Sequence, residues 1–172
     1  FILFAAFGLR DAITPIVSFG YGMGSRERVK QGIKYGMLYT LIIMAAGLVL
    51  LEIFAQPFAA LFGLSGETEQ LCISAMRVIS LSFIFAGANV AFQGIFQALE
   101  SGVQSLVISV CRQILFVLPV AWGFSLIVKN SGSTDMMWLV WLTFLIAEGL
   151  SAVIAVILMT GISRRRISTL GN

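Results

Sequence analysis

The sequence predicts an all-α membrane protein, a polytopic helical bundle of about five transmembrane helices that forms a single domain over residues 1–172. Composition is the first reason. Of the residues, 59% are hydrophobic and 11% are charged, whereas a soluble domain has about 25% charged residues with which to cover its surface. The second reason is that apolar runs recur along the chain, each with the roughly 20 residues that a helix needs to cross a hydrocarbon layer of about 30 Å.

Five stretches satisfy this length requirement, and short turns separate them. They cover approximately residues 1–21, 35–56, 71–99, 105–128 and 136–161. Glycine and serine mark the connections at residues 22–25, 63–66, 100–102 and 130–133. Because the connections are short, consecutive helices are expected to run antiparallel. The third stretch is longer than a span requires, so we expect it to tilt or to project from the membrane.

The basic residues predict the orientation, since Lys and Arg accumulate on the cytoplasmic side of membrane proteins. One group lies in the segment 22–34, and the other is the run Arg164–Arg166 after the last predicted helix. The connections on the opposite side contain a single basic residue, Lys129. We therefore expect a multi-pass protein of the cell membrane whose 22–34 loop and C-terminus are cytoplasmic.

The residue inventory argues against an enzyme or a metal site. The chain has no histidine, which removes the usual general base and the commonest metal ligand. It also lacks a glycine-rich phosphate loop with a lysine. Cys72 and Cys111 fall in different predicted helices near opposite membrane faces, so a disulfide is not expected. We expect no catalytic residue, no metal ligand, no cofactor and no nucleic-acid partner, because membrane topology already explains the basic segments.

Charged side chains inside the predicted spans are candidates for function. A charge at mid-membrane costs at least about 2.5–3.5 kcal/mol, so it usually faces a cavity or a partner. Asp11 lies near the middle of the first span, where it either lines a solute or ion pathway or is neutralised by Arg10. Glu148 lies halfway along the fifth span with no basic residue within two turns. It is either a pathway or proton-binding residue, or a protonated group that is hydrogen-bonded to a neighbouring helix.

A stripe of amides on the third predicted helix adds further candidates. Asn89, Gln93 and Gln97 recur at a spacing of four residues, which places them on one face, where they either line a cavity or bond to an adjacent helix. Arg112 is expected to extend its guanidinium to the membrane surface. The predicted pathway residues are Asp11, Asn89, Gln93 and Glu148.

Several segments match, in order, a known transporter pattern. They are Pro15–Gly22 with Glu27-Arg28-Val29 and Gly32-Ile33-Lys34, then residues 77–87 with Gln93-Gly-Ile-Phe-Gln97, then Arg112-Gln113 with Leu118-Pro119, and finally Trp141-Leu-Thr-Phe with Ala147-Glu148. Together they resemble helices eight to twelve of the multidrug and toxic compound extrusion (MATE) family.

The resemblance implies a twelve-helix transporter of two six-helix lobes, of which this chain would be most of the C-terminal lobe, with an N-terminal lobe as its partner. It also implies an antiporter that exports cationic amphipathic compounds in exchange for Na⁺ or H⁺ by alternating access. Asn89 stands where some members carry an acidic cation-binding residue. An asparagine offers a carbonyl oxygen to Na⁺ but cannot exchange a proton.

Two other functions remain open. A lipid-linked oligosaccharide flippase of the same superfamily would need basic residues in its cavity for a pyrophosphate, and the predicted spans offer Arg10 and Arg112. A five-helix membrane subunit without transport activity is the other alternative. The chain begins with Phe1 inside an apolar run, which favours a piece of a longer protein over a complete subunit.

Overall fold

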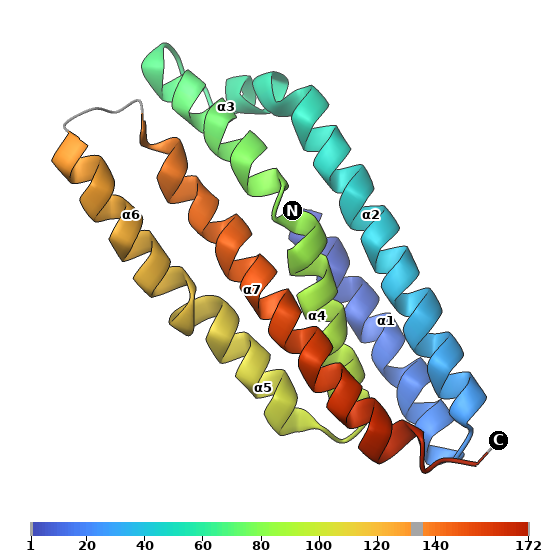
Figure 1. Cartoon of the computed structure of the whole chain (residues 1–172). Coiled ribbons are helices and arrows are strands. Elements are labelled where there is room, and N and C mark those ends of the chain that lie inside the picture. The colour runs from blue at the N-terminus through green and yellow to red at the C-terminus, as the bar shows by residue number, and fades with distance from the viewer. Residues whose placement is uncertain (1, 132–135, 172) are drawn as a thin grey trace.

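The computed structural model describes residues 2–131 and 136–171, and they form long helices packed side by side (Figure 1). The helices are α1 (Ile2–Gly22), α2 (Arg26–Leu61), α3 (Glu67–Ser80), α4 (Phe83–Ala98), α5 (Gly102–Val110), α6 (Val117–Ser131) and α7 (Trp138–Ile162). Two π-helical turns complete them: η1 (Cys111–Leu115) joins α5 to α6, and η3 (Ser163–Ile167) follows α7. The all-α prediction is confirmed. The predicted turn at 130–133 falls partly outside the described residues.

Four stretches are individually long and apolar enough to cross a membrane. They are α1, α2, the run Gly102–Asn130 that includes α5 and α6, and the run Trp138–Ile167 that includes α7. Helices α3 and α4 meet the same criterion together as a bent pair, which brings the number to five. Many large apolar side chains point outward along these helices, as expected where the solvent is lipid. The prediction of about five transmembrane helices is confirmed.

The predicted third helix, residues 71–99, is two helices rather than one. The axes of α3 and α4 differ by 48° across a short break. At this break the hydroxyl group of Ser82 donates to the carbonyl oxygen of Ile79 at 2.7 Å, and the hydroxyl group of Ser80 lies within hydrogen-bond distance of the Arg77 carbonyl oxygen, at 2.7 Å, and of Oε1 of Glu52, at 2.8 Å. Serine hydroxyl groups that bond to the preceding turn compete with the regular helical ladder. The excess length was visible in the sequence, and the serine pair is the local signal for the break.

Helix α2 begins earlier and ends later than the predicted range of 35–56. The predicted basic loop at 22–34 therefore shrinks to a short turn at 23–25, because Arg26–Lys34 already forms the first turns of α2. Gly24 has a φ of +69° in this turn, a conformation that glycine adopts without steric cost. Near its other end the helix is irregular at Phe54, three residues before Pro57, whose ring crowds the preceding turn.

The C-terminal tail returns to the turn between α1 and α2. Ser25 and Gly171 form an isolated parallel β-bridge, and the N–H of Arg26 donates to the carbonyl oxygen of Gly171 at 3.0 Å. The two basic segments therefore lie at the same end of the bundle, near the label C in Figure 1. That this end faces the cytoplasm remains a prediction from the distribution of charge.

Glycines allow α1 to approach both α2 and α4 closely. A Cβ atom at Gly36 would lie 2.7 Å from Cγ1 of Ile13, and one at Gly94 would lie 2.5 Å from Cγ of Arg10. Most of α4 is buried between these helices and α7, so its polar residues Asn89 and Gln93 face other helices, whereas Gln97 near its end is exposed. The largest buried cluster surrounds these contacts and includes Val17, Val29, Ile95, Phe96, Leu99 and Ile108.

Candidate functional site

A buried ion pair joins α7 to the π-helical turn η1 within the membrane-spanning region. Nε of Arg112 donates to Oε1 of Glu148 at 2.5 Å, and each side chain is 11% exposed. An isolated buried charge costs several kcal/mol in lost hydration, and contact between opposite charges offsets that cost. The two residues are 36 positions apart, so spacing along a single helix could not indicate the pair.

Asn89 on α4 completes this network. Its Nδ2 donates to Oε2 of Glu148 at 2.8 Å and to the backbone carbonyl oxygen of the same residue at 3.0 Å. The asparagine is fully buried. The Glu148 carboxylate therefore links α4, α7 and η1. Two of the predicted pathway residues, Asn89 and Glu148, are in direct contact.

Three buried oxygen atoms on α4 and α7 have no hydrogen-bond partner among the described residues. They are Oδ1 of Asn89, Oγ1 of Thr143 and Oγ of Ser151. Ser151 lies one turn beyond Glu148 on the buried face of α7. Buried polar atoms normally have a partner, and neutral oxygen atoms suit a water molecule or a hard cation. Thr143 and Ser151 could not be predicted from the sequence, because single hydroxyl groups in an apolar helix carry no distinctive pattern.

The position of Arg112 corrects the expectation that its guanidinium extends to the membrane surface. The side chain points inward to Glu148 and is nearly covered. Arg112 lies in η1, where the N–H of Phe116 donates to the carbonyl oxygen of Cys111 at 2.9 Å. Such π-helical turns insert an additional residue into a helix and are frequent at functional sites. The favourable contact with a buried carboxylate replaces the contact with water that the sequence suggested.

The remaining amides of the α4 stripe have different surroundings. Nε2 of Gln97 donates to Oγ of Ser105 on α5 at 3.1 Å. Gln93 lies between Asn89 and Gln97 and is 6% exposed. Within the described part of the chain its side chain makes no hydrogen bond. Asn89 and Gln97 therefore bond to adjacent helices, and a pathway role for Gln93 remains a prediction.

Asp11 is separate from this network. Its Oδ1 accepts hydrogen bonds from Nε and Nη2 of Arg10 at 3.0 and 2.8 Å, and its side chain is 67% exposed. The carboxylate is thus neutralised by its neighbour in sequence. The buried side of α1 is formed by Ala6, Ile13 and Val17, and helical geometry places Asp11 on the opposite side. The structure therefore leaves Asp11 on an uncovered face of α1.

Comparison with known proteins identifies the family. The sequence model of the MatE family matches residues 1–122, well over half of the chain. The chain belongs to the MatE family. This family consists of membrane transporters, which is consistent with the expectation that the chain is not an enzyme.

Individual relatives extend this result. A curated relative from Shewanella oneidensis, described as an FAD transporter, is 26% identical over 120 residues, which cover 70% of this chain and 26% of the relative. The outward-facing conformation of a multidrug resistance MATE family transporter of the MOP superfamily has a TM-score of 0.79 at 22% identity, covering 95% of this chain and 35% of that one.

A MOP superfamily transporter from Pyrococcus furiosus, described as having a binding pocket of reverse polarity, has a TM-score of 0.76 at 23% identity. That match also covers 95% of this MatE chain and 35% of the other chain. These likenesses show the fold. The chain spans about a quarter of the length of the curated relative and about a third of the length of these solved transporters.

Proposed function

We propose that this MatE chain forms the C-terminal lobe of a secondary active transporter that exports cationic amphipathic compounds in exchange for Na⁺ or H⁺. Membership of the family supports transport. The observation that carries cation coupling is the Glu148 carboxylate, which is held inside the membrane-spanning region by Arg112 and Asn89. Ionisable groups at this depth are costly, and they mark ion or substrate pathways.

The network provides a physical route to coupling. The Glu148 carboxylate is already neutralised by Arg112. A coupling Na⁺ or proton therefore binds this carboxylate only when the Arg112 guanidinium withdraws. The unpartnered oxygen atoms of Asn89, which contacts Glu148, and of Ser151, one turn away on α7, are neutral ligands of the kind that suit a hard cation. Because the ion pair joins η1 to α7, cation binding and separation of these elements are linked. A ligand shifts a conformational equilibrium through such a difference in affinity between two states.

Asp11 and Gln93 belong to the proposed substrate pathway. The exposed Asp11 carboxylate lies on the uncovered face of α1, where it would attract a cationic solute. Binding of that solute would compete with Arg10 for the carboxylate, in the same way that a coupling ion competes with Arg112. Gln93 lies buried on α4 one turn from Asn89 and would contribute a neutral amide to this pathway.

The test uses the protein that carries this chain, with any adjoining sequence that its gene encodes, reconstituted in liposomes. Ethidium efflux is followed under an imposed Na⁺ or H⁺ gradient. We expect gradient-driven efflux that Glu148→Gln abolishes and Asp11→Asn strongly reduces. Glu27→Gln is the matched control, because this exposed carboxylate lies at the end of the bundle and contacts Gln31. Unchanged efflux in both variants would refute the site, and the absence of efflux under either gradient would refute cation antiport.

The relative described as an FAD transporter favours a second candidate, export of an anionic dinucleotide. Such a solute, like the lipid-linked substrate of a flippase, requires cationic groups for its pyrophosphate. In the described residues, Arg10 and Arg112 are each paired with a carboxylate, so neither offers an uncompensated positive charge. Liposomes loaded with FAD distinguish the candidates, since transport of FAD without transport of ethidium would select the anionic substrate. Membership of a transporter family argues against the five-helix subunit without transport activity.

A further inference from the structure

A cavity of about 490 Å³ lies at the end of the bundle that carries the basic residues. It is lined by the start of α5, including Gln104, and by Arg165 and Arg166 in η3. A second cavity of about 220 Å³ lies between α5 and α7. It shares Gln104, Ile162 and Arg165 with the first, so the two cavities adjoin. Together they form one groove, here termed the α5–α7 groove.

The α5–α7 groove is polar at one end and apolar at the other. Its polar end contains the two arginines, Glu100, Gln104 and the first turn of α5, where backbone N–H groups carry partial positive charge. Its apolar end continues along α7 past Ile157, Leu158 and Gly161. The polar end coincides with the end of the candidate membrane span Trp138–Ile167, so the groove runs from the membrane boundary toward the membrane interior.

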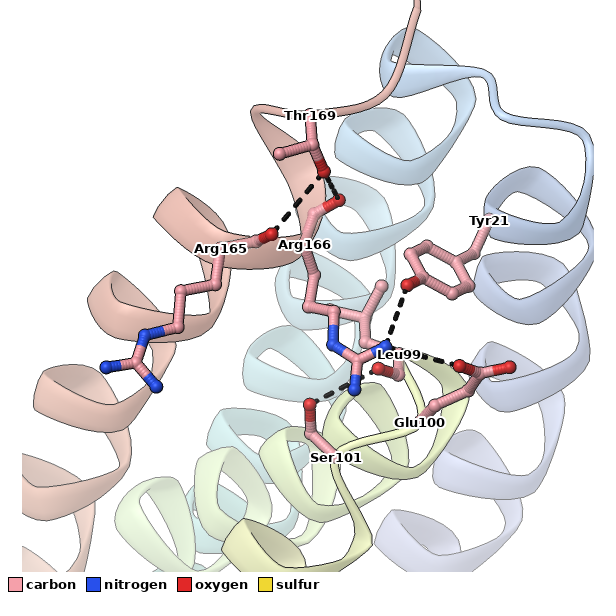
Figure 2. Close-up of polar contacts among 7 residues, drawn as sticks. All are labelled: Tyr21, Leu99, Glu100, Ser101, Arg165, Arg166 and Thr169. Atoms are coloured by element: carbon pink, nitrogen blue, oxygen red, sulfur yellow. Dashed lines mark hydrogen bonds and ion pairs between the residues drawn. The ribbon is translucent and has the colours of Figure 1, made fainter.

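Of the two arginines at the polar end, Arg166 is paired with a carboxylate and Arg165 is not paired with any in residues 2–131 and 136–171. Nη1 of Arg166 donates to the hydroxyl oxygen of Tyr21 at 3.1 Å and to Oε2 of Glu100 at 3.2 Å (Figure 2). The negative charge of Glu100 is therefore compensated by Arg166. Figure 2 shows the Arg165 side chain extending away from this cluster. Among the described residues its guanidinium has no ion-pair partner, so the groove retains one uncompensated positive charge.

We propose that the α5–α7 groove binds an anionic phospholipid. The phosphodiester lies against Arg165 and Gln104, and one acyl chain follows the apolar surface of Ile157 and Gly161. A basic residue at the membrane boundary attracts an anionic headgroup, and the adjoining apolar cavity suits a hydrocarbon chain but not a free phosphate. The proposal does not depend on which solute the transporter carries.

Affinity for phosphatidylglycerol tests the polar half of the proposal. The purified protein that carries this chain is titrated with phosphatidylglycerol or phosphatidylcholine in detergent, and native mass spectrometry measures the bound lipid. We expect Arg165→Ala to weaken phosphatidylglycerol binding about fivefold, the effect of one basic residue near an anionic headgroup. Arg164→Ala is the matched control, because it removes the same charge from the adjacent residue, which lines a different cavity. Equal losses in both variants, or equal binding of the two lipids, would overturn the proposal.

The apolar half is tested with Gly161→Leu, which fills the groove. No atom outside its own helical turn lies within 4 Å of a Cβ built at Gly161, so the fold accommodates the substitution. Gly149→Leu is the control, since Gly149 is equally open on the same helix and lies outside the groove. We expect Gly161→Leu alone to weaken phosphatidylglycerol binding several-fold. Unchanged binding, or binding of glycerol 3-phosphate as tight as that of the lipid, would refute the acyl-chain assignment.

Discussion

Removing Arg112 from its ion pair is expected to destabilise the bundle strongly. Unit charges at the observed separation of 2.5 Å interact by about 6–7 kcal/mol at an effective dielectric constant of about 20. The hydration that each ion loses costs several kcal/mol, so the intact pair contributes little net stability. Arg112→Met leaves the Glu148 carboxylate, which is 11% exposed in the intact pair, without its cation. The free energy of unfolding should fall by about 3–5 kcal/mol.

The double variant Arg112→Met/Glu148→Leu separates this penalty from a simple loss of packing. Both charges are then absent, and Asn89 retains its hydrogen bond to the backbone carbonyl oxygen at position 148. Paired removal of buried charges is often close to neutral, so the double variant should be more stable than Arg112→Met by at least about 2 kcal/mol. The unfolding free energies of the wild type, the two single variants and the double variant form the cycle.

The assay is reversible unfolding of the purified protein in mixed micelles by titration with sodium dodecyl sulfate. Arg77→Met provides the control, because Nε of Arg77 lies 3.9 Å from the Glu52 carboxylate and its side chain is 56% exposed. Ion pairs as exposed as this one contribute at most about 1 kcal/mol. Additive losses for Arg112→Met and Glu148→Leu would mean that the two groups do not interact, and the cation-coupling scheme built on their contact would fall with them.

Two further predictions concern packing and orientation. Gly36→Leu should lower the unfolding free energy by about 1–3 kcal/mol or more, because even a Cβ atom at this position would lie 2.7 Å from Ile13. Gly123→Leu is the control and should have little effect, because Gly123 lies in open space. Equal losses in both variants would contradict the close packing of α1 and α2. In a variant without its native cysteines, Thr169→Cys should react with a membrane-impermeant maleimide only after the membrane is opened, and Thr68→Cys should react from outside. The reverse labelling pattern would invert the predicted topology.

The number of spans and the family were readable from the sequence for physical reasons. Lipid requires about 20 apolar residues for each helix, so hydropathy alone locates the spans. It does not locate the ends of helices, because a helix continues beyond the membrane wherever local sequence permits. Helix α2 therefore includes Arg26–Lys34, which the charge pattern had suggested to be a loop. At the break between α3 and α4, the hydroxyl groups of Ser80 and Ser82 bond to the preceding turn, and the sequence does not specify which acceptors they take.

The candidate site was only partly readable. In the sequence, Asp11 and Glu148 are both carboxylates in the middle of apolar stretches. In the structure, Asp11 is 67% exposed beside Arg10, and Glu148 is 11% exposed between Arg112 and Asn89. The difference arises from the rotation of each helix about its axis and from the choice of neighbouring helix. Neither property follows from residue spacing within one helix, so the contact between Glu148 and Arg112 required the fold.

Helix α4 makes different kinds of contact on its two sides, close packing on one and polar links on the other, and this difference bears on where the lobe can rearrange. On one side, Gly94 brings the α4 backbone against Arg10, and close-packed surfaces resist gradual sliding. On the other side, the polar links to α7 and α5 are Asn89 to Glu148 and Gln97 to Ser105. Hydrogen bonds can exchange partners with water at little net cost, and a carboxylate can exchange one cation for another, whereas interlocked side chains cannot exchange partners in this way. Under the proposed mechanism, rearrangement therefore belongs to the side of the lobe that contains Glu148.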